Sequence, residues 1–479
     1  MEHFGFWSIL PPFLAIAIAI GTKKVIPSIF GGVLLGGIIL SNGNILSGIS
    51  KTFSIILNVF KDAGNTRTIL FTLLIGSLIT LLQSSGGVKG FIDKMEFVLR
   101  KKDSSSKKLF VQFAALATGI LIFIETNVSI LTTGTIFKPV FDKLKISREK
   151  LAYIADSGAS PVSVLLPFNA WGAFMFGILT AEGIGSPMKV ILEAIPLNFY
   201  PLSAMLLILF IIYFNVNIGP MKKAEENLPI SQTSNLTNKN FVDKKGGKAY
   251  RMVLPLILMV ISMPAFLIYS GWSSAANVGG VLSKMLEAFL HGSGSFAVLS
   301  AVIFSLLFSI ALYRFENLLS WKAIAKDFFT GIKSMLPLAV LMLLAFSIGA
   351  VSRELGTGLF LAEHAVGHVS TAFLPAIIFI AAAAISFSTG TSWGTFAIMT
   401  TIAIPVSNSL GANIPLTFAA LLSGGVFGDH CSPISDTTII ASLASGCSHI
   451  DHVKTQLPYA LISGALALFL FVGFGIAFN

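Results

Sequence analysis

The stretch GDHCSPISDTTI at residues 428–439 decides the fold, because it is a polar, proline-containing interruption within an otherwise apolar region. An earlier stretch, SGASPVSVLLP at residues 157–167, shares its Ser-Pro-x-Ser core. Proline inside a helix removes a backbone hydrogen bond, and non-helical backbone at membrane depth is tolerated only where it is buried in protein or lines a cavity. We therefore predict two broken transmembrane helices, interrupted at 160–163 and at 432–435.

The two interruptions belong to a longer internal repeat. LLQSSGGVKGFI at 81–92 resembles AVSRELGTGLF at 350–360, and ETNVSILTTGTIFKPV at 125–140 resembles STGTSWGTFAIMTTIAIPV at 388–406. The three matches occur in the same order and at nearly the same separation. In each copy, two short apolar segments flank a polar tip, which predicts a re-entrant hairpin. The segments are 109–123 and 128–140 in the first copy, and 374–387 and 393–406 in the second.

Composition places the chain in a membrane. Hydrophobic residues make up 54% of it and charged residues only 11%, against roughly 25% charged in a soluble domain. Apolar runs long enough to cross a bilayer recur, and such spans must be helical. We predict spans at 5–21, 25–42, 69–83, 195–217, 251–270, 294–314, 333–352 and 457–478. Residues 45–61 are amphipathic, which predicts a helix lying in the membrane interface.

Basic residues set the orientation, since cytoplasmic loops attract lysine and arginine. Loops 89–108 and 138–150 of the first copy are rich in both, whereas the equivalent loops 353–373 and 405–428 hold only Arg353. If the basic loops lie inside, the two copies are inverted relative to each other and both termini lie outside. Inverted repeats with a site near the midplane are an architecture of secondary transporters.

The predicted fold is therefore an all-α polytopic membrane protein with two inverted-topology repeats. Each repeat contributes a re-entrant hairpin and a broken transmembrane helix, and about 10 helices span the membrane besides the two hairpins. The predicted divisions are N-terminal helices at 1–64, repeat 1 at 65–217, a cytoplasmic linker at 218–250, connecting helices at 251–332 and repeat 2 at 333–479.

The residues around the breaks suit a small cation. Carbonyls freed by an unwound helix, together with hydroxyl and amide oxygens, are hard ligands. Half-helix N-termini would equally suit an anionic substrate. The candidate binding residues at the breaks, at the hairpin tips and beside the cavity are Ser160, Ser163, Ser432, Ser435, Thr126, Asn127, Thr389, Thr391 and Asn169.

Four acidic residues lie at the tips and breaks: Asp429, Asp436, Asp156 and Glu125, in decreasing order of expectation. An acid within the membrane costs roughly 2.5–3.5 kcal/mol on insertion scales, so such residues are usually functional. A carboxylate that holds either a proton or a sodium ion provides exchange; the alternative is that the acid pairs with a neighbour or reaches water. His430 is a candidate proton relay, or else a structural hydrogen-bonding residue.

GDHCSPISDTTIIAS at 428–442, together with HVKTQLPYAL at 452–461, resembles the NhaC-type sodium/proton antiporter family of the ion-transporter superfamily, and the resemblance extends over 65–475. It implies a scaffold domain and a mobile domain, working as a homodimeric elevator. It also implies that sodium binds at Ser432, Ser435, Asp436 and Asp429, with Thr437 in the same site.

The resemblance leaves an alternative function open. It also covers relatives that exchange or import amino acids or carboxylates such as malate and lactate, with Na⁺ or H⁺ as the coupling ion. We predict Na⁺/H⁺ exchange across the cell membrane, with transported ions and no cofactor. An enzyme is not predicted, since HExxH, CxxC and Walker A motifs are absent from the sequence. The net charge of +10 reflects loop lysines, so no nucleic-acid partner is expected.

Overall fold

The structure, a computed structural model, describes residues 4–22, 24–87, 89–90, 104–123, 125–167, 169–226, 247–274, 280–365 and 370–478. These residues are almost entirely helical and contain no strand, which confirms the all-α prediction. Among them, eight helices are long and apolar enough to cross a membrane, or nine if the pair 187–197 and 199–214, bent by 42°, is one span. The chain is therefore an integral, multi-pass membrane protein.

The N-terminal helices follow the predicted pattern. They are η1 (Gly5–Ile9), α1 (Leu10–Thr22), α2 (Val25–Leu40), α3 (Ile45–Asn58), η2 (Val59–Lys61) and α4 (Ala63–Ser84). On α3, large apolar side chains that include Leu46, Phe53 and Leu57 are exposed. Exposed apolar side chains on an amphipathic helix favour the interfacial position that the sequence predicts, and that position stays a prediction.

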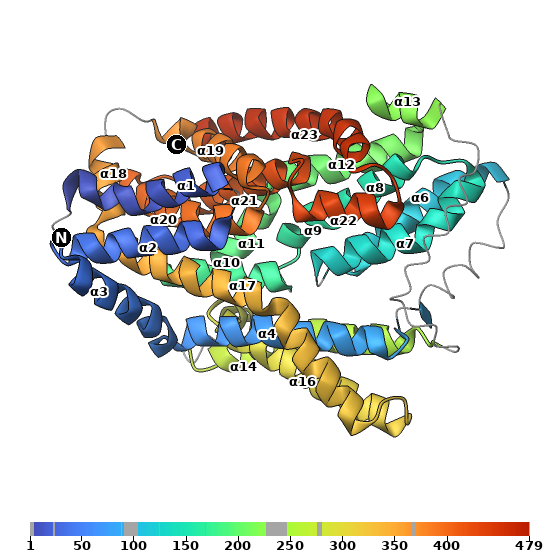
Figure 1. Ribbon diagram of the computed structural model, residues 1–479, viewed down its shortest axis with the longest axis horizontal. Coiled ribbons are helices and arrows are strands. Elements are labelled where there is room, and N and C mark those ends of the chain that lie inside the picture. Colours follow the sequence, from blue (N-terminus) through green and yellow to red (C-terminus); the bar gives the residue numbers. More distant parts are fainter. Residues whose placement is uncertain are drawn as a thin grey trace.

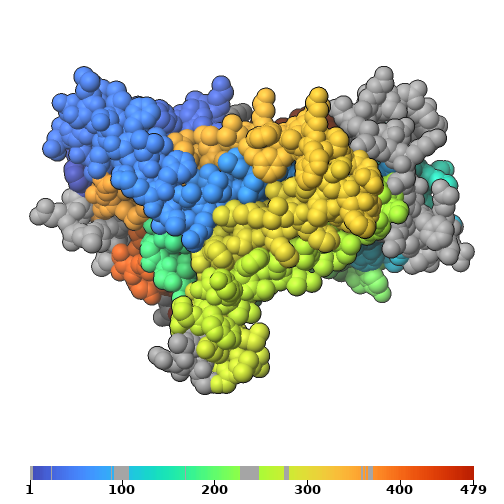
Figure 2. Space-filling model, turned by 90° about the horizontal axis from the view of Figure 1, so that it is seen from below, coloured from blue at the N-terminus to red at the C-terminus, as the bar shows by residue number. Residues whose placement is uncertain are grey.

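A group of long helices forms one side of the molecule, at the bottom of Figure 1 and facing the viewer in Figure 2. Besides α4 it contains α14 (Tyr250–Gly271), α15 (Val281–Leu290), α16 (Gly294–Phe315) and α17 (Trp321–Leu355). A Cβ on Gly76 of α4 would lie 2.3 Å from the carbonyl oxygen of Gly331 of α17. The two backbones are thus in direct contact, which is how membrane helices gain packing energy when lipid offers no hydrophobic driving force.

The other side of the molecule holds both predicted hairpins and both broken helices (Figure 1). The first copy consists of α6 (Ser104–Leu121), α7 (Thr126–Leu144), α8 (Arg148–Ser157), α9 (Ser160–Leu165) and α10 (Ala170–Ala181). It continues through α11 (Pro187–Ala194), η3 (Ile195–Leu197), α12 (Phe199–Phe214) and α13 (Pro220–Glu226). The second copy consists of α18 (Thr357–Ala365), η4 (Thr371–Phe373), α19 (Leu374–Thr389), α20 (Ser392–Leu410), α21 (Ile414–Cys431), α22 (Asp436–Ser445) and α23 (His449–Ala477).

The two copies present their elements in the same order. In each, a helix pair is followed by a helix that breaks and restarts. The second helices of the pairs, α7 and α20, are both 19 residues long. They carry Pro139 and Pro405 at the same position along the helix. This correspondence supports the repeat; its inversion and the re-entrant course of the pairs stay predictions.

The predicted position of the first break is wrong by a few residues. The helix is interrupted at Gly158 and Ala159, whereas Ser160 and Pro161 form the first turn of α9. Proline is favoured in a first helical turn because it has no N–H to leave unpaired there and its φ is already helical. The second break is where the sequence predicts it, since α21 ends at Cys431 and α22 begins at Asp436.

Both chain ends lie at the left of Figure 1, and α13, in the first part of the predicted linker, lies at the right. This is the arrangement that the predicted orientation requires. Residues 91–103 of the first basic loop and 227–246 of the linker are outside the described residues.

Candidate functional site

Asp429 lies at the end of α21, one turn before the second break, and its side chain is buried. Its two carboxylate oxygens accept hydrogen bonds from two serines on different elements. Ser435, which caps α22, donates to Oδ1 at 2.7 Å, and Ser392, the first residue of α20, donates to Oδ2 at 2.8 Å. The carboxylate thus joins the hairpin tip to the broken helix.

Ser435 is held by the local geometry of the break. As N-cap of α22 it accepts from the N–H of Thr437, and the two hydroxyls lie 3.0 Å apart. Serine is a favoured N-cap because its oxygen satisfies an unpaired N–H of the first turn. Carboxylate and hydroxyl oxygens from Asp429, Ser392, Ser435 and Thr437 are therefore gathered in one small volume.

The second hairpin tip is packed directly on this break. Gly390 ends α19 at a φ of +67°, and a Cβ there would lie 2.6 Å from the carbonyl oxygen of Ile434. Only glycine is free of strain in that conformation and at that distance. Ser432 reinforces the contact by donating to the Phe387 carbonyl at 2.7 Å.

Not every predicted hydroxyl reaches the site. Thr389 donates to the Ile385 carbonyl within its own helix, and Thr391 provides the N-cap position of α20 without a side-chain cap bond. Both flank Gly390 at the tip, so the structure places them beside the break rather than on Asp429.

Asp436 differs from Asp429 although the sequence ranks the two together. It is the first residue of α22, and its side chain is exposed. An acid in a first helical turn is stabilised by the helix dipole. It lies close enough to Glu125 and Asn127, at the first hairpin tip, to interact with them electrostatically. Glu125 itself caps α7 by accepting from the Val128 N–H at 2.6 Å.

The first hairpin tip contacts α9 through neutral polar groups. The hydroxyls of Thr126 and Ser163 lie 2.9 Å apart. Asn169, the N-cap of α10, donates to the carbonyls of Ser163 and Phe123 at 2.9 and 3.2 Å. Next to it, the Trp171 ring packs 4.8 Å from that of Trp393 on α20. These residues connect the two hairpin regions. The predicted ligands Ser163 and Asn169 both have partners within the protein, since the Ser163 hydroxyl also donates to the Ala159 carbonyl and the Asn169 oxygen accepts from the Gly172 N–H.

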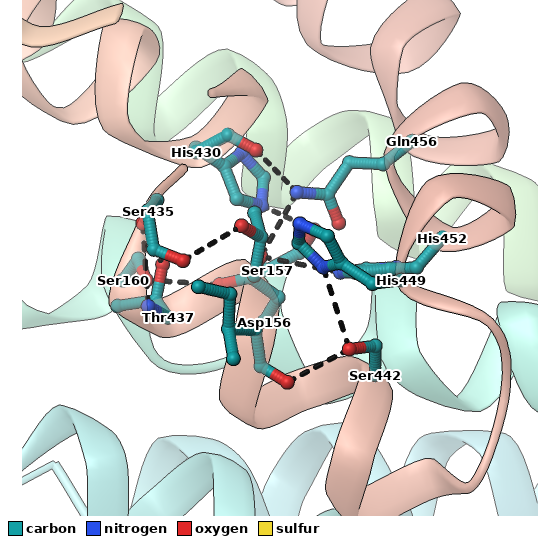
Figure 3. Close-up of polar contacts among 12 residues, drawn as sticks. Asp156, Ser157, Ser160, His430, Ser435, Thr437, Ser442, His449, His452 and Gln456 are labelled. Atoms are coloured by element: carbon teal, nitrogen blue, oxygen red, sulfur yellow. Dashed lines mark hydrogen bonds and ion pairs between the residues drawn. The ribbon is translucent and has the colours of Figure 1, made fainter. Parts of the chain in front are cut away.

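Asp156, at the end of α8, lies at the centre of a second buried cluster (Figure 3). Ser160 donates to its Oδ1 at 3.0 Å and Gln456 of α23 donates to its Oδ2 at 2.9 Å. His452 of the same helix places Nε2 3.6 Å from Oδ2. All four side chains are buried.

His430 connects the two clusters. Its Nε2 lies 3.1 Å from the Ser157 hydroxyl and its Nδ1 lies 2.7 Å from the Tyr200 hydroxyl. Its backbone carbonyl accepts from the Gln456 amide, which also donates to Asp156. Since both partners of this amide nitrogen are acceptors, the orientation of the Gln456 amide is determined. His430 therefore takes part in a continuous polar network across both broken helices (Figure 3).

Five residues of these clusters were not predicted: Ser157, Tyr200, Ser392, His452 and Gln456. His452, Gln456 and Tyr459 are spaced at three and four residues on α23, so they share one face of an otherwise apolar helix. A polar stripe at that spacing was the available signal. The partners of Ser157, Tyr200 and Ser392 are far away in sequence, and no local pattern identifies them.

The oxygen-rich clusters do not resemble a resident metal centre. Within the part of the chain that the structure describes, three or more His, Cys, Asp or Glu side chains nowhere come together in a way that could hold a metal ion. One carboxylate with hydroxyls is instead a weak, hard-oxygen site, suited to a small cation that must leave again.

Comparison with known proteins gives the chain a family context. Residues 184–476 match the model of the Na⁺/H⁺ antiporter family. A protein of Haemophilus influenzae with no stated function is 33% identical over 465 residues, which cover 95% of this chain and 88% of that protein. The Na⁺/H⁺ antiporter NhaC of Bacillus subtilis is 28% identical over 40% of this chain and 44% of its own length. The malate-2H⁺/Na⁺-lactate antiporter of the same organism is 40% identical, over 19% of each chain.

Among solved structures, the YdaH transporter of Alcanivorax borkumensis has a similar fold. It superposes with a TM-score of 0.60 over 90% of both chains, at 17% sequence identity. At this identity the likeness shows a shared transporter fold alone.

Proposed function

The chain belongs to the Na⁺/H⁺ antiporter family, so it is a secondary transporter, and we propose that it exchanges Na⁺ for H⁺ across the cytoplasmic membrane. The family membership confirms the resemblance that the sequence indicates around 428–442. The identity of the exchanged ions is argued below from the surroundings of one carboxyl group.

The observation that carries the proposal is the environment of Asp429. The side chain is 2% exposed. Two serine hydroxyls donate to it, and among the described residues it forms no ion pair with Lys, Arg or His. A lone buried carboxylate costs several kcal/mol. It must therefore be neutralised either by a proton or by a cation from solution, and this requirement makes the two ions compete.

The serines complete the cation site. A hydroxyl that donates its hydrogen to Asp429 keeps its oxygen lone pairs, so Ser392 can offer its oxygen to Na⁺ beside the carboxylate. The Ser435 oxygen already accepts from the Thr437 N–H and can offer its remaining lone pair. Thr437, 3.0 Å from Ser435, is a further oxygen. We place the transported sodium ion at Asp429, Ser392 and Ser435, and Asp436 at its approach because that side chain is exposed.

Reconstituted vesicles test the proposal. Purified protein is incorporated into vesicles that contain a pH-sensitive dye, and Na⁺ is added outside between pH 6 and 9. Sodium-triggered proton movement is expected, and Asp429→Asn vesicles serve as the inactive reference. No proton movement in this range would refute sodium/proton exchange.

A second function has specific support, because part of the chain resembles an antiporter named for malate and lactate. In that case Na⁺ or H⁺ would couple to a small carboxylate or amino acid, held at a half-helix N-terminus such as that of α22. Radiolabelled malate, lactate and arginine are offered to the same vesicles. Accumulation of any of them, without sodium-driven proton movement, would favour this alternative.

We also propose the domain organisation that the sequence predicts. It consists of N-terminal helices at 1–64, repeat 1 at 65–217, a cytoplasmic linker at 218–250, connecting helices at 251–332 and an inverted repeat 2 at 333–479. The transporter would work as a homodimer with an elevator-type motion of one domain. Lys223 of α13 is an exposed residue in the first part of the linker. With Cys431 and Cys447 replaced by alanine, Lys223→Cys should react with a membrane-impermeant maleimide only after the cells are opened; labelling of intact cells would reverse the orientation.

A further inference from the structure

The two buried acids at the broken helices have different partners. Asp429 is surrounded by serine hydroxyls, whereas Asp156 has an imidazole and an amide beside a single hydroxyl. The difference matters because hydroxyl oxygens bind a cation well, while an amide nitrogen and a protonated imidazole donate hydrogen and repel one. The surroundings of Asp156 are therefore poorly suited to Na⁺.

His452 is the unusual member of the Asp156 cluster. Its side chain is 0% exposed, and neither ring nitrogen has a hydrogen-bond partner among the described residues. A buried, unsatisfied polar group costs about 1–3 kcal/mol. The nearest charge is Asp156 Oδ2, 3.6 Å from Nε2. A proton on the imidazole turns this contact into an ion pair, and it compensates the buried carboxylate at the same time.

The geometry points to a second proton site in the first broken helix: Asp156 and His452 hold a proton that is released when the sodium ion binds at Asp429. This inference rests on the proposed function and adds a linked proton site to the competition at one carboxylate. The pair carries one proton more than a carboxylate with a neutral imidazole. When that proton leaves for water, a single negative charge remains at Asp156, so proton release at one site is balanced by Na⁺ entry at the other.

Other titratable groups near the pair do not replace it. The titratable groups that interact with Asp156, besides His452, are Tyr200 from α12, Asp429 and His430 from α21, and Asp436 from α22. Tyr200 is neutral near pH 7, both His430 nitrogens already have hydroxyl partners, and the two acids offer no positive charge to Asp156. Of α22, Figure 3 labels Thr437 and Ser442, and neither carries a charge. Among the described residues of this cluster, His452 is thus the titratable group without a hydrogen-bond partner; the Gln456 Oε1 also has none, but it does not titrate.

The test counts protons. Full-length protein in detergent is titrated with NaCl by calorimetry at pH 7 in two buffers of different ionisation enthalpy, which gives the protons released per Na⁺ bound. His452→Gln preserves size but holds no extra proton. We expect the count to fall by about one and the sodium affinity at pH 7 to rise, because sodium binding no longer has to displace that proton. His291→Gln, an exposed histidine on α15, is the matched control and should behave as wild type.

Asp156→Asn gives an independent answer if the glutamine variant does not fold. It removes the other half of the pair, and it should abolish the same proton release while Na⁺ still binds. An unchanged proton count in either folded variant would overturn the inference and return the proton to Asp429. Wild-type protein that binds Na⁺ without releasing protons, or does not bind it, would overturn the proposed function and the inference with it.

Discussion

Replacing Ser392 by alanine is the sharpest test of the sodium site. The Ser392 side chain is 0% exposed, and its hydroxyl makes one hydrogen bond, to Asp429 Oδ2 at 2.8 Å. It is not the N-cap of α20, a position that Thr391 occupies. The substitution therefore removes a contact to the carboxylate and a cation ligand without weakening the helix start. Ser435→Ala would be less clear, because it also removes the cap of α22.

The expected magnitude follows from the strength of a hydrogen bond to a charged group, about 1.5–3 kcal/mol. Sodium binds only to the ionised carboxyl group, so destabilising the carboxylate weakens sodium binding by the same free energy. At about 1.4 kcal/mol per tenfold change, the sodium concentration for half-maximal exchange should rise roughly 10- to 150-fold.

The measurement is the initial rate of dye response in vesicles over a range of sodium concentrations at fixed pH. Thr400→Val on the same helix is the matched control, since the Thr400 hydroxyl is equally buried but donates within α20, to the Phe396 carbonyl. A rise of less than about twofold for Ser392→Ala would show that the Ser392 hydroxyl does not contact the transported ion.

Three further outcomes are expected. Asp429→Asn should abolish sodium/proton exchange in vesicles. Asp436→Asn changes an exposed acid and should reduce the exchange rate less than about tenfold, because a solvated charge contributes little. An equal loss of exchange in both variants would place Asp436 inside the site. Gly331→Ala should lower the free energy of unfolding by about 1–3 kcal/mol, and with it the melting temperature in detergent, because the new Cβ would lie 2.3 Å from the Gly76 carbonyl oxygen. Gly473→Ala is the control, since there is open space around Gly473. Equal melting temperatures of the two variants would contradict the close contact. Burial raises the pKa of Glu182, just beyond α10, to about 7 despite the Arg353 guanidinium 3.3 Å away. The folded protein then binds this proton more tightly than the unfolded chain, so stability falls as pH rises from about 4.5 to 7. The melting temperature of Glu182→Gln relative to wild type should therefore increase between pH 5 and 8. A constant difference in melting temperature would argue against a buried, titrating Glu182.

Most helices could be predicted because membrane spans are a local signal. Apolar length alone located α1, α2, α14 and α16 to within a few residues. Three predicted spans were too short, since α4 begins at Ala63, α17 at Trp321 and α23 at His449. Their first turns carry charged and polar residues, which apolar length excludes, although such residues continue a helix readily outside the membrane.

The site was harder to predict because its contacts connect distant parts of the chain. The sequence identified Asp156, Asp429 and Ser435 from the breaks themselves. It ranked Asp436 with Asp429, because spacing along the chain does not say which of two acids turns inward. His452 and Gln456 were missed for a similar reason: their partner, Asp156, is some 300 residues away, and only the folded chain brings them together.

The single amide of Gln456 has a thermodynamic consequence. It donates to the Asp156 carboxylate and to the carbonyl of His430, the residue after Asp429, so it links the first acid to the backbone that carries the second. Linkage between two ligands is reciprocal: whatever factor a proton at one acid imposes on sodium affinity, sodium imposes on proton affinity. A titration of either ion in the presence of the other therefore measures the same coupling constant twice. Gln456→Leu, which cannot donate to either group, should bring that coupling constant close to one, so that the two ions bind independently of each other.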